Sequence, residues 1–315
     1  MLKFMKKIPG GLLLIPMLIS ALFTTFLPGI FNVPGITEAL FTTKGSNYIV
    51  GLICFLSSTA LDLKSLKKVL RKQGSILLIK IILAFVFSIL FVKFFGMEGI
   101  FGISAISFIA TICSLNPSLY LALAQDYGSK NDEAGFGLTA ILCVPAFPIL
   151  VFAVAKSSAV DWTPVISVLI PIVLGIVIGN LDKDMAKFFM PGVAILTPFM
   201  GWAFGAGINI IAAFKAGFQG IILTVLFYIL LFPLIFLFER KLLKENGLTT
   251  FSITSVAGLS VSVPALLAHT DPSLLVYQDT AIAQIALAVV ITSFITPALT
   301  GLYAKKKGIK KNHEI

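Results

Sequence analysis

Long runs of apolar residues, separated by short polar stretches, make up most of the chain. A helix needs about 20 mainly apolar residues to cross the hydrocarbon core of a membrane. The sequence lacks the alternation typical of membrane β-strands, and backbone polar groups must be paired within lipid. We therefore predict an all-α polytopic membrane protein with ten transmembrane helices. The predicted helices are residues 10–29, 46–62, 74–95, 99–125, 133–155, 162–180, 190–210, 216–238, 250–269 and 278–303.

The composition supports this interpretation. Apolar residues make up 58% of the chain, charged residues 12%, and the mean hydropathy is +1.02. Soluble domains average about 45–50% apolar and about 25% charged residues, so a soluble globule could not cover so much apolar surface. This excludes an ordinary soluble enzyme, a disordered chain and a secreted disulfide scaffold. The cysteines lie inside apolar runs and are predicted to pack there, without metal-ligand spacing: Cys54, Cys113 and Cys143.

The net charge of +10 does not indicate nucleic-acid binding, because the basic residues form short clusters between the apolar runs. With the N-terminus inside, most of the 24 basic residues fall in loops on one side of the membrane, including residues 64–72 and 305–311. Positive loops stay cytoplasmic. We expect a multi-pass protein of the cell membrane with both termini cytoplasmic and basic clusters that contact lipid headgroups.

Landmark residues recur at a nearly constant offset. Pro117 precedes Pro264 by 147 residues, and Asp132 precedes Asp279 by the same interval. The recurrence predicts two five-helix repeats. Because five is odd, the second repeat must enter the membrane upside down, as in many secondary transporters whose substrate site lies where the halves meet. The predicted repeats are residues 1–155 and 156–315.

Two predicted helices are interrupted at matching positions, in the segments 111–118 and 254–264. A proline inside a helix removes one N–H and displaces a carbonyl, and the freed groups must face water, protein, an ion or a solute. Small polar side chains accompany the breaks and suit a polyhydroxylated solute, while half-helix N-termini favour a carboxylate. A proline kink whose serines bond to their own helix is the alternative. The predicted breaks are Pro117, Gly258 and Pro264, and the predicted substrate-binding residues beside them are Ser114, Asn116, Ser118, Ser255 and Ser262.

Charged residues in membrane helices are costly and therefore candidates for function. Lys80 lies in the third predicted helix, Asp62 ends the second and Asp279 begins the last. The Lys80 ammonium either snorkels to the cytoplasmic face or lies in the core, where it replaces a coupling cation or pairs with a substrate carboxylate. For Asp62 the alternative is a helix end that meets headgroups. We retain all three as coupling candidates.

Motifs of enzyme chemistry are missing from the sequence: it has no GxSxG elbow, HExxH pair, P-loop or Rossmann fingerprint. Two histidines cannot form a metal cluster. We expect no catalytic residue, metal or bound cofactor, and an ion gradient rather than ATP as the energy source.

The chain resembles the 2-keto-3-deoxygluconate permease family over essentially its full length. The matching features are Ile8-Pro-Gly-Gly11 with Pro16, Leu70-Arg-Lys-Gln-Gly74, Lys80, Asn116, Leu119-Tyr120, Tyr127-Gly128, Glu133-Ala-Gly135, GIVIGNLD from Gly175 to Asp182, Pro198, Ala257-Gly258, Pro264 and Pro297. The resemblance implies proton-coupled import of a sugar acid on a fold similar to the bile-acid sodium symporter type.

That fold would place helices 1, 2, 6 and 7 in a panel and helices 3–5 and 8–10 in a core, where the unwound fourth and ninth helices cross. The core would rock against the panel, and Ser57, Ser58 and Thr59 would complete the substrate site from the panel side. Family members often carry acids where this chain has Cys113 and Leu142. A sodium-coupled carrier of another organic anion on the same fold therefore remains the alternative. The resemblance leaves open whether the protein is a monomer or a homodimer.

Overall fold

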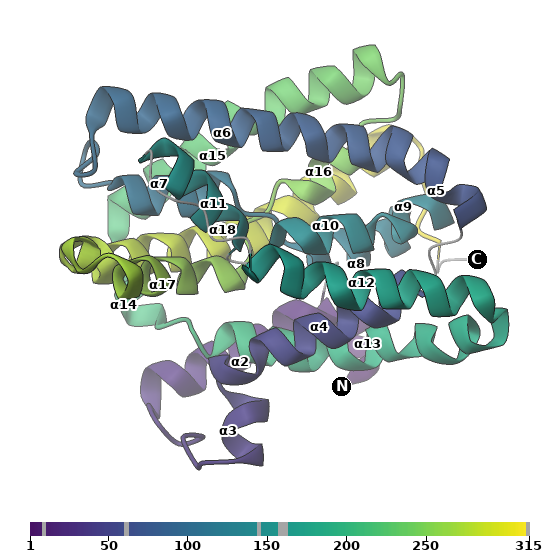
Figure 1. Cartoon of the computed structure of the whole chain (residues 1–315), viewed down its shortest axis with the longest axis horizontal. Coiled ribbons are helices and arrows are strands. Elements are labelled where there is room, and N and C mark those ends of the chain that lie inside the picture. Colours follow the sequence, from purple (N-terminus) through teal and green to yellow (C-terminus); the bar gives the residue numbers. More distant parts are fainter. Residues whose placement is uncertain (8–10, 60–62, 144–145, 157–162, 313–315) are drawn as a thin grey trace.

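The computed structural model describes residues 1–7, 11–59, 63–143, 146–156 and 163–312, and these are almost entirely helical. Within them, β-pairing is limited to one isolated bridge between Ile100 and Ile103. The predicted all-α class is therefore confirmed for the part of the chain that the structure describes (Figure 1). The helices of the first half are α1 (Leu2–Lys7), α2 (Gly11–Phe26), α3 (Ile36–Phe41), α4 (Ser46–Ser58), α5 (Leu63–Val69), α6 (Ser75–Phe95), α7 (Ala105–Ile112), α8 (Pro117–Tyr127), α9 (Lys130–Ala134), α10 (Phe136–Cys143) and α11 (Ala146–Ala155).

The second half continues in the same way. Its helices are α12 (Thr163–Leu181), α13 (Lys183–Gly205), α14 (Ile210–Lys215), α15 (Gly217–Leu237), α16 (Leu248–Ile253), α17 (Val263–Thr270) and α18 (Leu275–Lys306). Short 3-10 or π turns join several of them, namely η1 (Thr43–Gly45), η2 (Leu70–Gly74), η3 (Phe238–Leu242), η4 (Gly258–Ser262) and η5 (Pro272–Leu274).

Five helical stretches are long and apolar enough to cross a membrane: Lys67–Phe95, Ala105–Tyr127, Lys183–Gly205, Gly217–Leu242 and Pro272–Lys306. The second of them joins α7 and α8 across the non-helical residues 113–116. The other predicted spans coincide with shorter or interrupted helices, such as α2 and α4. The predicted boundary at residue 190 is wrong, because α13 begins at Lys183. The cause is Asp182, whose carboxylate accepts hydrogen bonds from two backbone N–H groups of the first turn and caps the helix there.

Four helices pack closely together: α2 lies against α13, and α4 lies against both α12 and α13 (Figure 1). Glycines permit the approach. A Cβ atom on Gly179 would lie 1.9 Å from the Thr59 carbonyl oxygen, and one on Gly205 would lie 2.0 Å from that of Met17. Small residues at a helix interface allow the backbones of membrane helices to come into contact. These contacts hold α2, α4, α12 and α13 together as one group.

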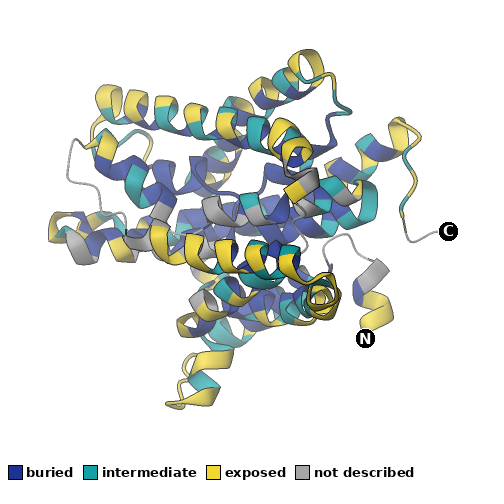
Figure 2. Ribbon diagram, turned by 45° about the vertical axis from the view of Figure 1, so that its right-hand side comes forward, coloured by how far each residue is buried: buried dark blue, intermediate teal, exposed yellow. Residues whose placement is uncertain are grey.

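The remaining long helices surround a buried centre formed by α7 and α8. In an 18-residue window of the Ala105–Tyr127 span about 94% of the residues are buried, against 33% in the corresponding window of the Lys67–Phe95 span. Figure 2 shows buried residues in the middle of the bundle and exposed residues along the outer helices. Large apolar side chains such as Phe94 on α6 and Phe218 on α15 are exposed there. Such outward apolar faces are suited to lipid rather than water.

Candidate functional site

The segment between α7 and α8 is the first predicted break, and the chain there is not helical. Helix α7 ends at Ile112 and α8 begins at Pro117. The Asn116 side-chain oxygen caps α8 by accepting a hydrogen bond from the Leu119 N–H at 3.1 Å. Pro117 therefore occupies the first position of a helix, where a missing N–H costs nothing, and does not kink a continuous helix, which was the alternative to the predicted break.

The second break separates α16 from η4 and α17. Helix α16 ends at Ile253, and Pro264 is the second residue of α17. Helix α18 pairs with the backbone between them: the Thr292 hydroxyl accepts from the Val256 N–H at 3.0 Å, and the Thr296 hydroxyl donates to the Thr254 carbonyl at 2.6 Å. These hydrogen bonds hold the segment extended although it is buried.

The two breaks touch each other. The Ser114 hydroxyl accepts a hydrogen bond from the Ala257 N–H at 2.7 Å and lies 2.7 Å from the Ser260 hydroxyl. On either side of this contact, α7 packs against α17 and α8 packs against α16. Ser114 therefore bonds across the crossing and not back to its own helix.

Several buried polar atoms near these breaks have no hydrogen-bond partner among the described residues. They include the Asn116 amide nitrogen and the hydroxyls of Thr111 and Ser255 on the breaks, and that of Ser293 on α18. Buried polar groups are almost always paired, so each exception requires an explanation. Both donors and acceptors are available, which suits a ligand that carries hydroxyl and carboxylate groups.

Lys80 lies on α6 with none of its surface exposed. Its ammonium lies 5.2 Å from the centre of the Phe227 ring on α15 and has no hydrogen-bond partner among the described residues. The side chain therefore does not snorkel to the surface. Cys113, in the first break, lies near this ammonium.

Ser118 and Gly258 face α13. The Ser118 hydroxyl contacts the Met200 sulfur at 3.4 Å. A Cβ atom on Gly258 would lie 2.6 Å from the Phe204 Cβ. Both crossing elements therefore pack directly against the helix group of α2, α4, α12 and α13.

Other predicted site residues are placed elsewhere. Ser57 and Thr59 donate to carbonyls of their own helix, those of Cys54 and Leu56. The buried Ser58 hydroxyl has no partner among the described residues, and a Cβ atom on Gly175 of α12 would lie 2.9 Å from the Ser58 Cβ. Asp279 is exposed near the start of α18. Asp62 and the side chains of Ser262 and Leu142 lie outside the part of the structure that is described.

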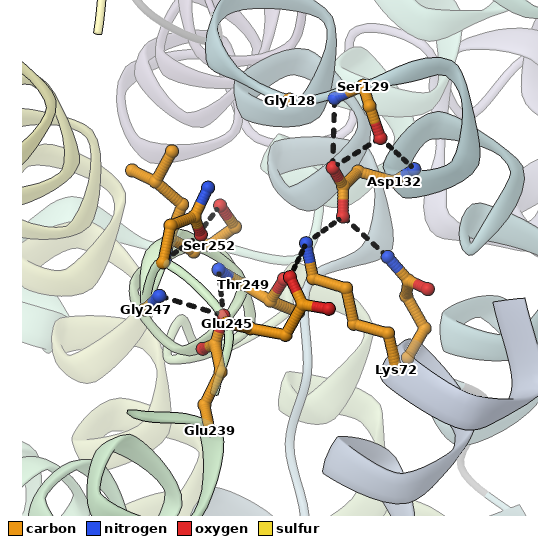
Figure 3. Close-up of polar contacts among 12 residues, drawn as sticks. Lys72, Gly128, Ser129, Asp132, Glu239, Glu245, Gly247, Thr249 and Ser252 are labelled. Atoms are coloured by element: carbon orange, nitrogen blue, oxygen red, sulfur yellow. Dashed lines mark hydrogen bonds and ion pairs between the residues drawn. The ribbon is translucent and has the colours of Figure 1, made fainter. Parts of the chain in front are cut away.

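Sequence reasoning missed a charged network at the end of the molecule that holds α5 and α9 (Figure 3). The Lys72 ammonium lies 2.7 Å from the Asp132 carboxylate and 3.5 Å from that of Glu245. Gln73 donates to Asp132 at 2.6 Å. Asp132 had served only as a landmark of the repeat, and the pattern of the chain gives no indication that it meets Lys72.

Glu239 completes this region from the second half of the chain. It is fully buried, and its carboxylate accepts hydrogen bonds from three backbone N–H groups at the start of α16 and from the Thr250 hydroxyl (Figure 3). A carboxylate at a helix N-terminus satisfies donors that the helix itself leaves unpaired. Glu239 thereby fixes where α16 begins, one and a half turns before the second break.

At the opposite end of the molecule, Lys156 after α11 pairs with Asp271 after α17. The hydrogen bond from Lys156, followed by that from the Ser273 hydroxyl, lowers the pKa of Asp271 to about 2. Asp271 therefore stays ionised throughout the physiological range, and this contact does not respond to ordinary changes in pH.

Comparison with known proteins gives a consistent result. A profile of the 2-keto-3-deoxygluconate permease family matches residues 2–309. The 2-keto-3-deoxygluconate permease 1 of Salmonella typhimurium is 31% identical over 305 residues, covering 97% of this chain and 96% of that protein. The 2-keto-3-deoxygluconate permease of Bacillus subtilis is 31% identical over 312 residues (97% and 94%), and that of Tolumonas auensis is 29% identical over 308 residues (96% and 91%).

Proposed function

Because this chain belongs to the 2-keto-3-deoxygluconate permease family, and is therefore a membrane transporter rather than an enzyme, we propose that it imports 2-keto-3-deoxygluconate or a similar sugar acid by proton symport. The relatives' names support the substrate class. The transport cycle is alternating access, in which one buried site opens to each side of the membrane in turn. No cofactor takes part besides the coupled proton.

The proposed architecture is ten transmembrane helices in two inverted repeats, residues 1–155 and 156–315, with both termini cytoplasmic. The contacts α2 with α13 and α4 with α12 support it. In the proposed repeats, α2 corresponds to α12 and α4 corresponds to α13, so each contact joins the first helix of one repeat to the second helix of the other. The pairs α7 with α17 and α8 with α16 have the same relation. The group α2, α4, α12 and α13 is then the panel, and the crossing belongs to the core.

The substrate site is proposed at the crossing of the two breaks. The substrate hydroxyls pair there with the Asn116 amide and the Ser255 and Thr111 hydroxyls, which lack other partners among the described residues. The N-terminus of α8 and the Lys80 ammonium offer positive charge to the carboxylate. Ser118 and Gly258 lie at the contact between core and panel, so sliding at this contact opens the site to one side or the other.

Lys80 is the proposed proton carrier. Burying an ammonium without a hydrogen-bond partner costs free energy. That cost is removed either when an anionic substrate pairs with the ammonium or when the ammonium releases its proton. The family resemblance implies an acid at position 113, beside Lys80. In this chain the position is Cys113, so we propose that Lys80 acts without that acid and that the substrate carboxylate takes its place.

A single observation carries the proposal: two helix breaks from different halves bond to each other through Ser114 and are accompanied by unpaired buried polar atoms. The test is uptake of labelled 2-keto-3-deoxygluconate by proteoliposomes, with and without an inward proton gradient and with and without sodium. Accumulation that requires the proton gradient and ignores sodium is the expected result. Accumulation that requires sodium would support the alternative coupling, and no uptake by folded protein would refute the substrate.

A further inference from the structure

A polar pocket with a volume of about 370 Å³ opens at the end of the molecule that holds the charged network. Ligand pockets for small molecules begin at about 300 Å³. The first half of the chain supplies most of the wall, and the second half closes it with Leu243 and Glu245. The lining residues are Lys68, Arg71, Lys72, Gln73, Ser129, Asn131, Leu243 and Glu245.

Two π turns flank this pocket. Arg71, Lys72 and Gln73 all belong to η2, and Leu243 directly follows η3. Single π turns are rare and occur frequently at functional sites. Here the wide turn of η2 places three consecutive polar side chains in the wall of the pocket, and residues that follow η3 line it as well. This arrangement is more specific than a basic cluster that merely orients a membrane helix.

The pocket has an excess of positive charge. Lys72 is paired with Asp132 and Glu245 and is therefore neutralised. Lys68 and Arg71 are exposed and have no acidic partner within the described residues. The Asn131 amide adds a neutral hydrogen-bonding group to the wall, while the Ser129 hydroxyl already donates to the Asp132 carboxylate. Two unpaired cations beside a neutral hydrogen-bonding group are the chemistry that recognises an oxyanion, and arginine in particular forms bidentate bonds to phosphate and carboxylate.

We propose that this pocket binds an oxyanion, a phosphate or carboxylate group held between Lys68 and Arg71. Both cations precede α6 in the first half of the chain, and Leu243 and Glu245, after α15, line the same pocket from the second half, so the proposed site lies where the two halves meet at this end. The oxyanion comes either from an anionic lipid headgroup or from a soluble metabolite. This binding does not depend on transport at the crossing, which lies in other elements.

The test uses the full-length protein in nanodiscs and measures its unfolding temperature. One arm adds inorganic pyrophosphate to nanodiscs of neutral phosphatidylcholine, and the other replaces part of the lipid with phosphatidylglycerol. The test variant is K68Q/R71Q. The matched control is K305Q/K306Q, which removes the same charge at the exposed end of α18.

Stabilisation by pyrophosphate in wild type and control, with affinity at least about tenfold weaker in K68Q/R71Q, would identify a soluble oxyanion. Stabilisation by phosphatidylglycerol alone, with the same dependence on Lys68 and Arg71, would identify a lipid headgroup at this pocket. The proposal is overturned if neither anion stabilises the protein, or if the two double variants lose the effect equally.

Discussion

At the scale of single residues, the energetics of Lys80 connect structure to function. Its ammonium gains some stabilisation from the Phe227 ring, which in a desolvated site amounts to about 2 kcal/mol. The cost of burying an unpaired charge is several kcal/mol. A residue that costs stability in this way is retained for a reason other than folding, and the proposed reason is coupling.

The variant K80M separates these two roles. Methionine keeps the aliphatic volume and removes the charge, so the free energy of unfolding should rise by about 1–4 kcal/mol. Uptake should fall at least about 100-fold, because a charge-assisted contact worth about 3 kcal/mol is lost. K93M, at the exposed end of α6, should change neither quantity. Normal uptake by folded K80M would contradict the role given to Lys80.

Gly258 provides a second residue-scale prediction. In G258A the new Cβ would meet the Phe204 Cβ at 2.6 Å, an atom fixed to the α13 backbone that cannot swing aside. The variant should lose about 1–3 kcal/mol of stability and most of its uptake, since the crossing can no longer approach α13. G51A is the control, because nothing lies within 4 Å of its Cβ. Equal behaviour of the two variants would show that this contact is unimportant.

At the scale of elements, the sequence locates the breaks well because proline and small polar residues mark them. It could not predict that Ser114 bonds to Ala257, since that contact joins residues far apart in the chain. The break before Pro117 has a local cause: Asn116 caps a new helix and leaves proline at its first position. Hydrophobicity alone does not distinguish one kinked helix from two half-helices.

The start of α16 depends on Glu239, which gives an element-scale prediction. E239A would leave three backbone N–H groups buried without their acceptor, and it should cost about 3 kcal/mol or more of stability, since each unsatisfied group costs about 1–3 kcal/mol. E38A removes an exposed ion pair with Lys44 and should cost less than about 1 kcal/mol. Denaturant unfolding in detergent measures both. Equal losses would show that the cap is dispensable.

At the scale of the whole molecule, the positions of Ser118 against Met200 and Gly258 against Phe204 define a contact between two groups of helices. Alternating access requires this contact to change during each cycle. The variant S118C/M200C, made without the native cysteines, should be locked by a short cleavable thiol cross-linker. Uptake should fall to background and return when the linker is cleaved, and the single cysteine variants should be unaffected. Normal uptake by the cross-linked protein would exclude movement at this contact.

The overall arrangement was predictable in part. The chain pattern identifies a helical membrane protein and two matching breaks, because apolar length and proline position are local signals. The charged network of Lys72, Asp132 and Glu245 was not predictable, because its residues come from three segments far apart in the chain. Ser57 and Thr59 bond back to carbonyls three residues earlier in the chain, a local contact that hydropathy does not encode.

The central claim is that sugar-acid import carries protons inward through Lys80. The most direct measurement is the internal pH of proteoliposomes after addition of 2-keto-3-deoxygluconate in sodium-free buffer, followed with an enclosed pH-sensitive dye. The account predicts acidification of the interior with wild type and K93M, and none with K80M. Substrate accumulation without acidification, or acidification that persists in K80M, would contradict it.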